Sequence, residues 1–262
     1  SGKNFNTIVS SDYGFFEKLD TLIQEEPIEF LDIETRGLIR AIGIVKGKPF
    51  DPDDRMKKIL TDAVAIGEAT ARSITYYPRD AGQYAWGDTE GTWVVPFADH
   101  DSSWIENGAR KIENQLYYHY NCIVVTPAMA AAPGPGKGSE YVFASLDSEE
   151  RILEGSKNYK MSLPPDVPVA DFWAITLYDT QTRSQLQTDQ QFPTLDTYTK
   201  GLKKNQDGSY DIYFGPEAPT GQESNWLQTV PGKSFFVCLR MYGPTEPWIE
   251  GKWRPSDVEL ME

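Results

Sequence analysis

Apolar residues recur at helical spacing in the first half of the chain and alternate as in β-strands in the second half. Phe15, Phe16, Leu19, Leu22 and Ile23 form one stripe with three- and four-residue steps, which is typical of an amphipathic helix. The same period predicts helices over residues 33–42, 51–74 and 106–124. The pattern therefore predicts a mainly helical region over residues 1–130.

Capping and turn residues indicate where these helices begin and end. Ser11 or Asp12 can cap the first helix, and Pro27 ends it. Asp51 is expected at the N-cap of the longest helix, with Pro52 at its first position. Residues 76–101 lose the helical period and contain several Gly and Pro residues, so we expect an ordered loop with one or two short strands.

The segment AMAAAPGPGKG, residues 128–138, is the strongest linker signal, and we place a domain boundary after residue 130. The apolar period then changes to two, and an Asp207-Gly208 pair predicts a tight hairpin turn. Strands are predicted over residues 141–146, 159–163, 172–178, 210–214 and 235–241. The expected fold class is α+β, with the helical part followed over residues 131–262 by an antiparallel β-sandwich of jelly-roll type.

The charge balance argues against several classes of partner. The 262 residues include 25 Lys and Arg against 39 Asp and Glu, a net charge of −14. Such a chain is poorly suited to nucleic acid or to an anionic membrane surface. No apolar run is long enough to span a membrane, and no nicotinamide, flavin or haem signature is present, so no cofactor is expected.

The chain begins at Ser1 without an apolar signal core. A processed terminus, a cleavage point inside a longer protein and an artificial start all stay open. Cys122 and Cys238 fall in apolar segments, which favours two buried thiols, although one disulfide stays possible in an exported protein. A periplasmic or secreted location is slightly favoured over a cytoplasmic one.

Four long strings in the second half resemble one known family. They are FWAITLYDTQTR (172–183), NQDGSYDIYFGPEAPTGQE (205–223), SNWLQTVPGK (224–233) and LRMYGPTEPWIEGKWRP (239–255). They are similar to the C-terminal module of a bacterial family of tandem domains of unknown function, catalogued as domains twelve-fifty-four and twelve-fourteen.

The N-terminal part is similar to the segment that precedes this module. The similarity lies in SGK at residues 1–3, QEEP at 24–27, AIGIVKGKPF at 41–50 and DPDDR at 51–55. The resemblance implies a jelly-roll β-sandwich and a companion domain or chain preceding Ser1. It implies no catalytic residues.

Histidine chemistry is sparse. His100 lies between Asp99 and Asp101, which could together hold a divalent ion, but a solvated loop histidine is the favoured interpretation. His119 and Cys122 are three residues apart on one predicted helix, and this pair lacks the third group that orients a catalytic base. We therefore expect no metal site and identify no catalytic residue.

The best candidate for a binding site is one face of the predicted sandwich. Alternation along two strands places Tyr178, Thr176, Arg240 and Tyr242 on the side opposite the apolar rows. Arg183 lies just beyond the first of these strands and adds a second cation. An aromatic surface with arginines suits a small organic acid or a sugar.

An alternative interpretation is that a helix or a preceding domain covers this face. In that case Arg240 would pair with a carboxylate such as Glu223 or Glu246. Trp226, Trp248 and Trp253 stand in loops rich in Pro and Gly. Exposed tryptophans there would favour ligand binding, whereas buried ones would anchor the loops.

Three functions stay open. The first is a small-molecule or partner-binding protein whose ligand-binding candidates are Tyr178, Arg183, Arg240, Tyr242 and Trp226. The second is a hydrolase or lyase with a site between the sandwich and a preceding domain, for which the candidates are Asp179, Arg183, Tyr178 and His119. The third is a structural module that forms homo-oligomers through the aromatic face.

Overall fold

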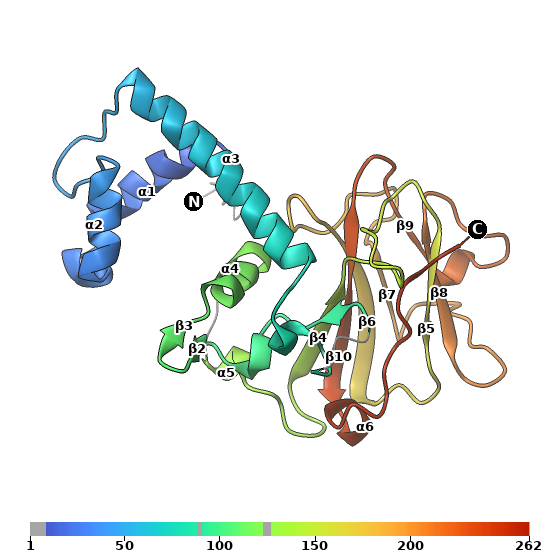
Figure 1. The fold of residues 1–262 in the computed structure, drawn as a ribbon. Coiled ribbons are helices and arrows are strands. Elements are labelled where there is room, and N and C mark those ends of the chain that lie inside the picture. Colours follow the sequence, from blue (N-terminus) through green and yellow to red (C-terminus); the bar gives the residue numbers. More distant parts are fainter. Residues whose placement is uncertain (1–8, 88–90, 123–126, 262) are drawn as a thin grey trace, which may run out of the picture. The chain divides into compact units, whose positions relative to one another are not determined.

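The computed structural model describes residues 9–87, 91–122 and 127–261 (Figure 1). The chain divides into two compact units, Ser1–Ser73 and Ile74–Glu262. The boundary expected after residue 130 falls inside the second unit, because strand β1 (Trp93–Val94), which precedes it, pairs with strand β4 (Ser139–Ala144), which follows it.

The first unit is helical. It contains α1 (Gly14–Glu25), a 3-10 turn (Ile28–Phe30), α2 (Ile33–Ala41) and most of α3 (Asp54–Tyr76). Its core is a small apolar cluster made of Phe16, Ile44, Leu60 and Val64. The helices predicted from apolar spacing are therefore confirmed here.

Charged side chains cap two helix ends in this unit. The Lys46 ammonium donates to the backbone carbonyls of Ile23 (3.2 Å), Gln24 (2.7 Å) and Glu26 (2.7 Å), which lack helical partners at the end of α1. At the start of α3, Asp53 accepts a 2.7 Å bond from the N–H of Met56.

The expectation that Asp51 caps α3 is therefore wrong. Several neighbouring aspartates compete for this role, and Asp53 is the one whose carboxylate bonds the N–H of the third helical residue.

The second unit contains two main sheets and a separate two-stranded hairpin. One has the order β1-β4-β10-β6-β7 and is antiparallel throughout, and the other has the order β11-β5-β8-β9, in which β8 and β9 run parallel. The remaining strands are β5 (Tyr159–Leu163), β6 (Val169–Asp179), β7 (Thr194–Asp196), β8 (Tyr210–Gly215), β9 (Trp226–Gln228), β10 (Phe235–Pro244) and β11 (Glu259–Leu260). The predicted α+β fold class is confirmed.

One apolar core joins the inner faces of the two sheets. β10 contributes Val237 and Leu239, β6 contributes Ile175, and β5 and β8 contribute Met161 and Ile212, all 0% exposed. Each strand sends alternate side chains into this core. Burial of this apolar surface is the main force that holds the two sheets together.

The segment before β4 departs from the prediction of one helix over residues 106–124. A hairpin of β2 (Ile105–Glu106) and β3 (Ala109–Arg110) comes first, and α4 covers only Ile112–Asn121. Asn107 and Gly108 lie between the strands at φ of 50° and 78°, which is typical of the Asn-Gly hairpin turn. Residues 123–124 lie outside the described part of the chain.

The Asp207-Gly208 turn predicted from the sequence is present. The Gly208 N–H bonds the Asn205 carbonyl at 3.0 Å, and the turn leads into β8. The segment around residue 128 forms a single helical turn, α5 (Pro127–Ala130), and another, α6 (Glu246–Ile249), follows β10.

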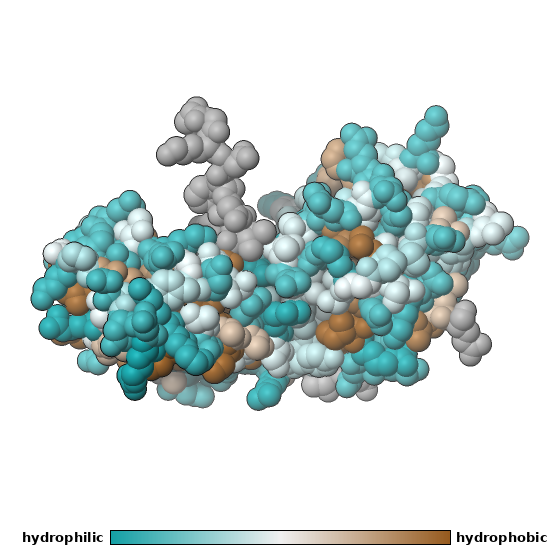
Figure 2. All heavy atoms as spheres, turned by 90° about the horizontal axis from the view of Figure 1, so that it is seen from above, coloured by the Kyte–Doolittle hydropathy of each residue, from teal (hydrophilic) through white to brown (hydrophobic). Residues whose placement is uncertain are grey.

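The surface in view in Figure 2 is mostly hydrophilic, with hydrophobic residues in separate small groups. No helix among the described residues is both long and apolar enough to cross a bilayer.

Truncation of Leu239 should destabilise the second unit selectively. Leu239→Ala leaves a cavity in the centre of the sandwich core, and such substitutions cost about 2–5 kcal/mol. All seven tryptophans lie between Trp86 and Trp253, so their fluorescence in a urea titration follows the second unit alone. Leu260→Ala, at a position that is 36% exposed, is the control. Equal midpoints for the two variants would contradict the assigned core.

Candidate functional site

The candidate site lies on the outer face of the five-stranded sheet, opposite the sandwich core. The register of β10 against β6 places Phe236 opposite Tyr178 and Cys238 opposite Thr176, with Arg240 two residues further along β10. These side chains alternate with the apolar residues that fill the core. The common side expected for the two outer rows is therefore observed.

Arg240 is the central charged group of this face. Its Nη1 donates to the Thr176 hydroxyl at 3.1 Å, and its Nη2 donates to the Tyr178 hydroxyl. The centre of the guanidinium lies 5.6 Å from the Tyr178 ring and 5.8 Å from the Tyr141 ring. These distances are typical of cation–π contacts, so the cation is held by hydroxyls and aromatic rings.

No described carboxylate lies within the 4.0 Å limit of an ion pair with Arg240. The interpretation in which Glu223 or Glu246 neutralises this cation is therefore wrong. Glu223 accepts a 2.9 Å bond from the N–H of Gly221 in its own loop, and Glu246 begins the short helix α6. The half-buried guanidinium of Arg240 retains N–H donors in addition to the two that bond the hydroxyls of Thr176 and Tyr178.

Aromatic rings extend this face beyond Arg240. Phe172 stacks on Tyr242 with a centroid distance of 4.1 Å, and Tyr141 meets the same ring edge-on at 6.3 Å. We call the set Tyr141, Phe172, Thr176, Tyr178, Arg240 and Tyr242 the arginine–aromatic face. Apart from the fully buried Thr176, its members are only partly buried, so the face stays accessible to a ligand.

One end of the sheet is covered by other aromatic residues. Tyr178 stacks on Phe236 at 5.1 Å, Phe236 contacts Tyr76 at 6.2 Å, and Tyr76 contacts Tyr120 of α4 at 6.2 Å. The guanidinium of Arg183 lies 4.2 Å from the centre of the Tyr120 ring. Arg183 and Arg240 thus stand at opposite ends of one run of aromatic contacts.

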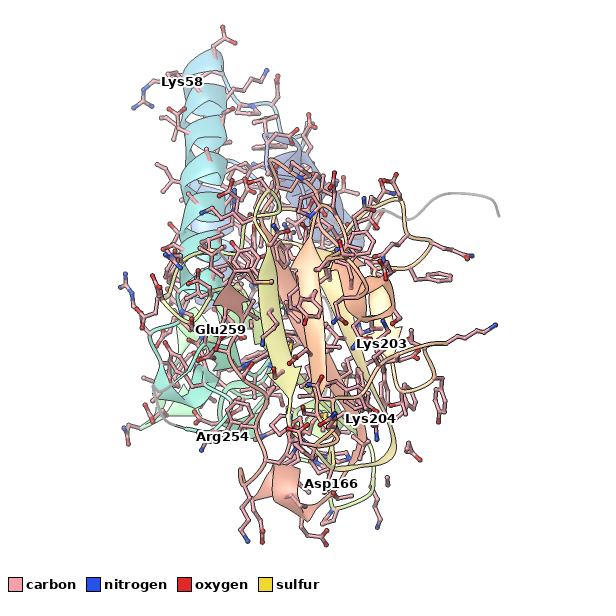
Figure 3. All side chains as sticks on the ribbon, turned by 90° about the vertical axis from the view of Figure 1, so that its right-hand side faces the viewer. Lys58, Asp166, Lys203, Lys204, Arg254 and Glu259 are labelled. Atoms are coloured by element: carbon pink, nitrogen blue, oxygen red, sulfur yellow. The ribbon has the colours of Figure 1, made fainter. Side chains whose placement is uncertain are left out.

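The four-stranded sheet faces the viewer in Figure 3. Asp211 accepts a 2.6 Å bond from the Ser162 hydroxyl, and Lys160 approaches it at 3.8 Å. Trp226 belongs to this sheet, and its indole N–H donates to the Gly215 carbonyl at 3.0 Å. The structure therefore places Trp226 apart from the other candidate ligand-binding residues.

The remaining tryptophan candidates are structural. Trp248 and Trp253 are 6% and 8% exposed and contact each other with centroids 6.1 Å apart. They belong to the sandwich core, so they anchor the loops in which they stand.

The groups considered for hydrolysis are not assembled around a common point. Asp179 accepts a 2.6 Å bond from Lys233 and a 2.7 Å bond from the N–H of Gln181, so it holds a turn. His119 is exposed and packs against the ring of Trp104 at 5.7 Å. Partial desolvation lowers the pKa of His119, but no observed hydrogen bond or ion pair joins it to a described acid or nucleophile.

The metal site considered at His100 is not formed by the described residues. Asp101 bonds Ser103 at 2.6 Å, Asp99 lies 3.2 Å from Lys111, and His100 Nδ1 lies 3.2 Å from the Ala130 carbonyl. No described group of three His, Cys, Asp or Glu residues could hold a metal ion.

Both cysteines are free thiols. Burial raises the pKa of Cys238 to about 12, although the nearby Arg240 opposes this shift. Burial likewise raises the pKa of Cys122 to about 11. Neither thiol therefore has the low pKa of a nucleophilic cysteine.

Comparison with known proteins is consistent with an uncharacterised family. Residues 138–246 match the model of the family described as "Protein of unknown function (DUF1214)". No curated protein matches the chain.

Two solved structures of uncharacterised function are similar over 95% of this chain. The VPA0106 protein from Vibrio parahaemolyticus shares 18% identity with a TM-score of 0.44, and 55% of its length is covered. A putative uncharacterized protein from Burkholderia cenocepacia shares 12% identity with a TM-score of 0.36, and 50% of its length is covered. The chain thus spans about half the length of these structures.

The sequence anticipated most members of the arginine–aromatic face but missed two. Tyr141 joins because β4 pairs with β10 so that Tyr141 lies opposite Arg240. Phe172 is not among the residues predicted for the site, and it joins by stacking on Tyr242. A pairing between strands this far apart in sequence has no local signal.

Cys238 should react slowly in the folded protein. Because Cys238 is 2% exposed and its pKa is about 12, we expect alkylation by iodoacetamide at pH 8 to be on the order of a thousandfold slower than in urea. A Cys122→Ser background isolates this thiol. Fast alkylation without urea would mean that the outer face of the sheet opens.

Proposed function

We propose that the protein binds a small organic anion with an aromatic or apolar part on the arginine–aromatic face. The observation that carries this proposal is the half-buried Arg240 guanidinium, which lies between aromatic rings and has hydroxyl partners but no described carboxylate partner. A carboxylate ligand would supply the missing counter-ion.

The chemistry of the face fits such a ligand. Guanidinium groups bind carboxylates through short, charge-assisted and often bidentate hydrogen bonds. Tyr178 and Thr176 already fix the plane of the Arg240 side chain, so little side-chain entropy remains to be lost on binding. The rings of Tyr141 and Tyr242 offer apolar surface for the rest of the ligand.

The negative net charge of the chain limits the places where an anion can be attracted. A charge of −14 repels an anion at long range, so attraction has to come from the local guanidinium. Arg183, at the other end of the aromatic run, is a candidate for a second cationic contact.

Binding is better supported than hydrolysis. Asp179 is bonded to Lys233 and to its own turn, and His119 contacts the Trp104 ring edge-on. A general acid or base has to come within hydrogen-bond reach of the reacting group, and neither residue contacts the arginine–aromatic face in an observed interaction. Assembly of copies through this face is the remaining alternative.

We also propose, from the sequence resemblance alone, the tandem arrangement in which a companion domain precedes this chain. In that arrangement the arginine–aromatic face would act together with a second domain or chain, and its natural ligand would depend on both.

Replacement of Arg240 should abolish anion binding. With sodium benzoate as the probe, we expect Arg240→Gln to weaken binding measured by calorimetry by about tenfold or more, because a hydrogen bond to a charged group contributes about 1.5–3 kcal/mol. Arg254→Gln is the matched control, since Arg254 also lies over an aromatic ring, 5.0 Å from Trp86.

Two outcomes would contradict this function. Saturable benzoate binding could be absent from the unaltered protein, or it could be equal in both variants. Sedimentation of the same samples tests the oligomer alternative, which predicts that Arg240→Gln changes the molecular mass in solution rather than the affinity for benzoate.

A further inference from the structure

A pocket of about 400 Å³ lies beside β4 and shares one lining residue, Tyr141, with the arginine–aromatic face. Its walls come from residues 95–97, 128–133 and 138–141, together with His100. Most of these residues are small or apolar, which is typical of pockets that bind organic molecules. Its titratable lining groups are Glu140, His100 and Tyr141.

Glu140 brings a carboxyl group into this largely apolar surrounding. Neighbouring residues of a strand point to opposite sides, so Glu140 stands on the other side of β4 from the ring that faces Arg240. No described residue donates a hydrogen bond to the side-chain carboxylate of Glu140, and none forms an ion pair with it within 4.0 Å. A carboxylate in such a position requires a counter-charge or a donor.

His100 adds a second acceptor. Its Nδ1 lies 3.2 Å from the Ala130 carbonyl oxygen, and a carbonyl oxygen only accepts, so Nδ1 carries the proton in this contact. The Nε2 of the neutral ring is then an acceptor. The backbone of His100 is held at φ of 53°, in the left-handed region, which a residue other than glycine seldom occupies.

We propose that this pocket binds a small organic amine in its ammonium form, with Glu140 as the counter-ion. An ammonium group carries up to three N–H donors and no acceptor, which matches a carboxylate and an imidazole that both accept. The ring of Phe97 in the lining suits the organic part and the cation itself. A bare metal ion fits less well, because the described residues include no cluster of three metal ligands.

The electrostatics of Glu140 support this assignment. Burial raises the pKa of its carboxyl group, and His100 in its protonated form opposes the shift. A group with a raised pKa loses its proton later than an exposed glutamic acid, so affinity for an ammonium ligand should increase as the pH rises through that pKa. The bound cation should in turn lower the pKa of Glu140, because binding and deprotonation are linked.

The test uses benzylamine, with benzyl alcohol as a neutral probe of similar size. We expect saturable benzylamine binding at pH 7 and binding by benzyl alcohol that is weaker by about tenfold or more. Glu140→Gln should weaken benzylamine binding by about tenfold or more and reduce its dependence on pH. Glu113→Gln, which removes an exposed carboxylate from α4, is the matched control.

A second variant keeps the test decisive if Glu140→Gln unfolds. Ala131→Phe introduces a ring into the pocket wall and should block benzylamine while leaving Glu140 in place. Arg240→Gln should not change benzylamine affinity, so failure of this inference is distinguishable from failure of the anion site. Equal binding of amine and alcohol, or equal binding by the Glu140→Gln and Glu113→Gln variants, would overturn the proposal.

Discussion

The antiparallel pairing of β10 with β4 and β6 is the constraint on which the second unit depends. Because β10 is bonded on both sides, its alternation decides what each face of the sheet contains. Val237 and Leu239 enter the core, and Cys238 and Arg240 face outwards. A shift of one residue in this register would bury Arg240 in the sandwich, so the core that stabilises the fold also fixes the position of the cation.

This constraint produces two sheets with different outer faces. The four-stranded sheet carries ordinary polar pairs, such as Asp211 with Ser162. The five-stranded sheet carries a cation among aromatic rings whose hydrogen-bonding capacity is not exhausted by the described residues. Buried charges in proteins are normally compensated, and this difference is the basis of the binding site proposed for the five-stranded sheet.

The sequence predicted the elements better than their pairing. Periodicity located the helix stripe at Phe15–Ile23 and the strands around Trp173 and Leu239, since burial of one face imposes its period on the local sequence. It did not predict that Tyr141 lies opposite Arg240, or that His100 and Glu140 line one pocket. Both depend on contacts between distant segments that no local pattern encodes.

Local rules also failed where two signals competed. Residues 106–111 were assigned to a helix because apolar spacing continues into α4, although Asn107-Gly108 is a hairpin signal of equal strength. Among the aspartates before α3, composition alone could not identify the cap, because Asp51, Asp53 and Asp54 all have suitable side chains.

The lengths of the outermost strands affect how copies of the protein meet in concentrated solution. Both sheets end in very short strands, β1 and β7 in one and β11 and β9 in the other, each of two or three residues. Such edges offer few unpaired backbone groups to a neighbouring chain, which discourages growth into continuous sheets and fibrils. The protein can therefore expose the arginine–aromatic face with a low risk that copies aggregate by pairing their edge strands.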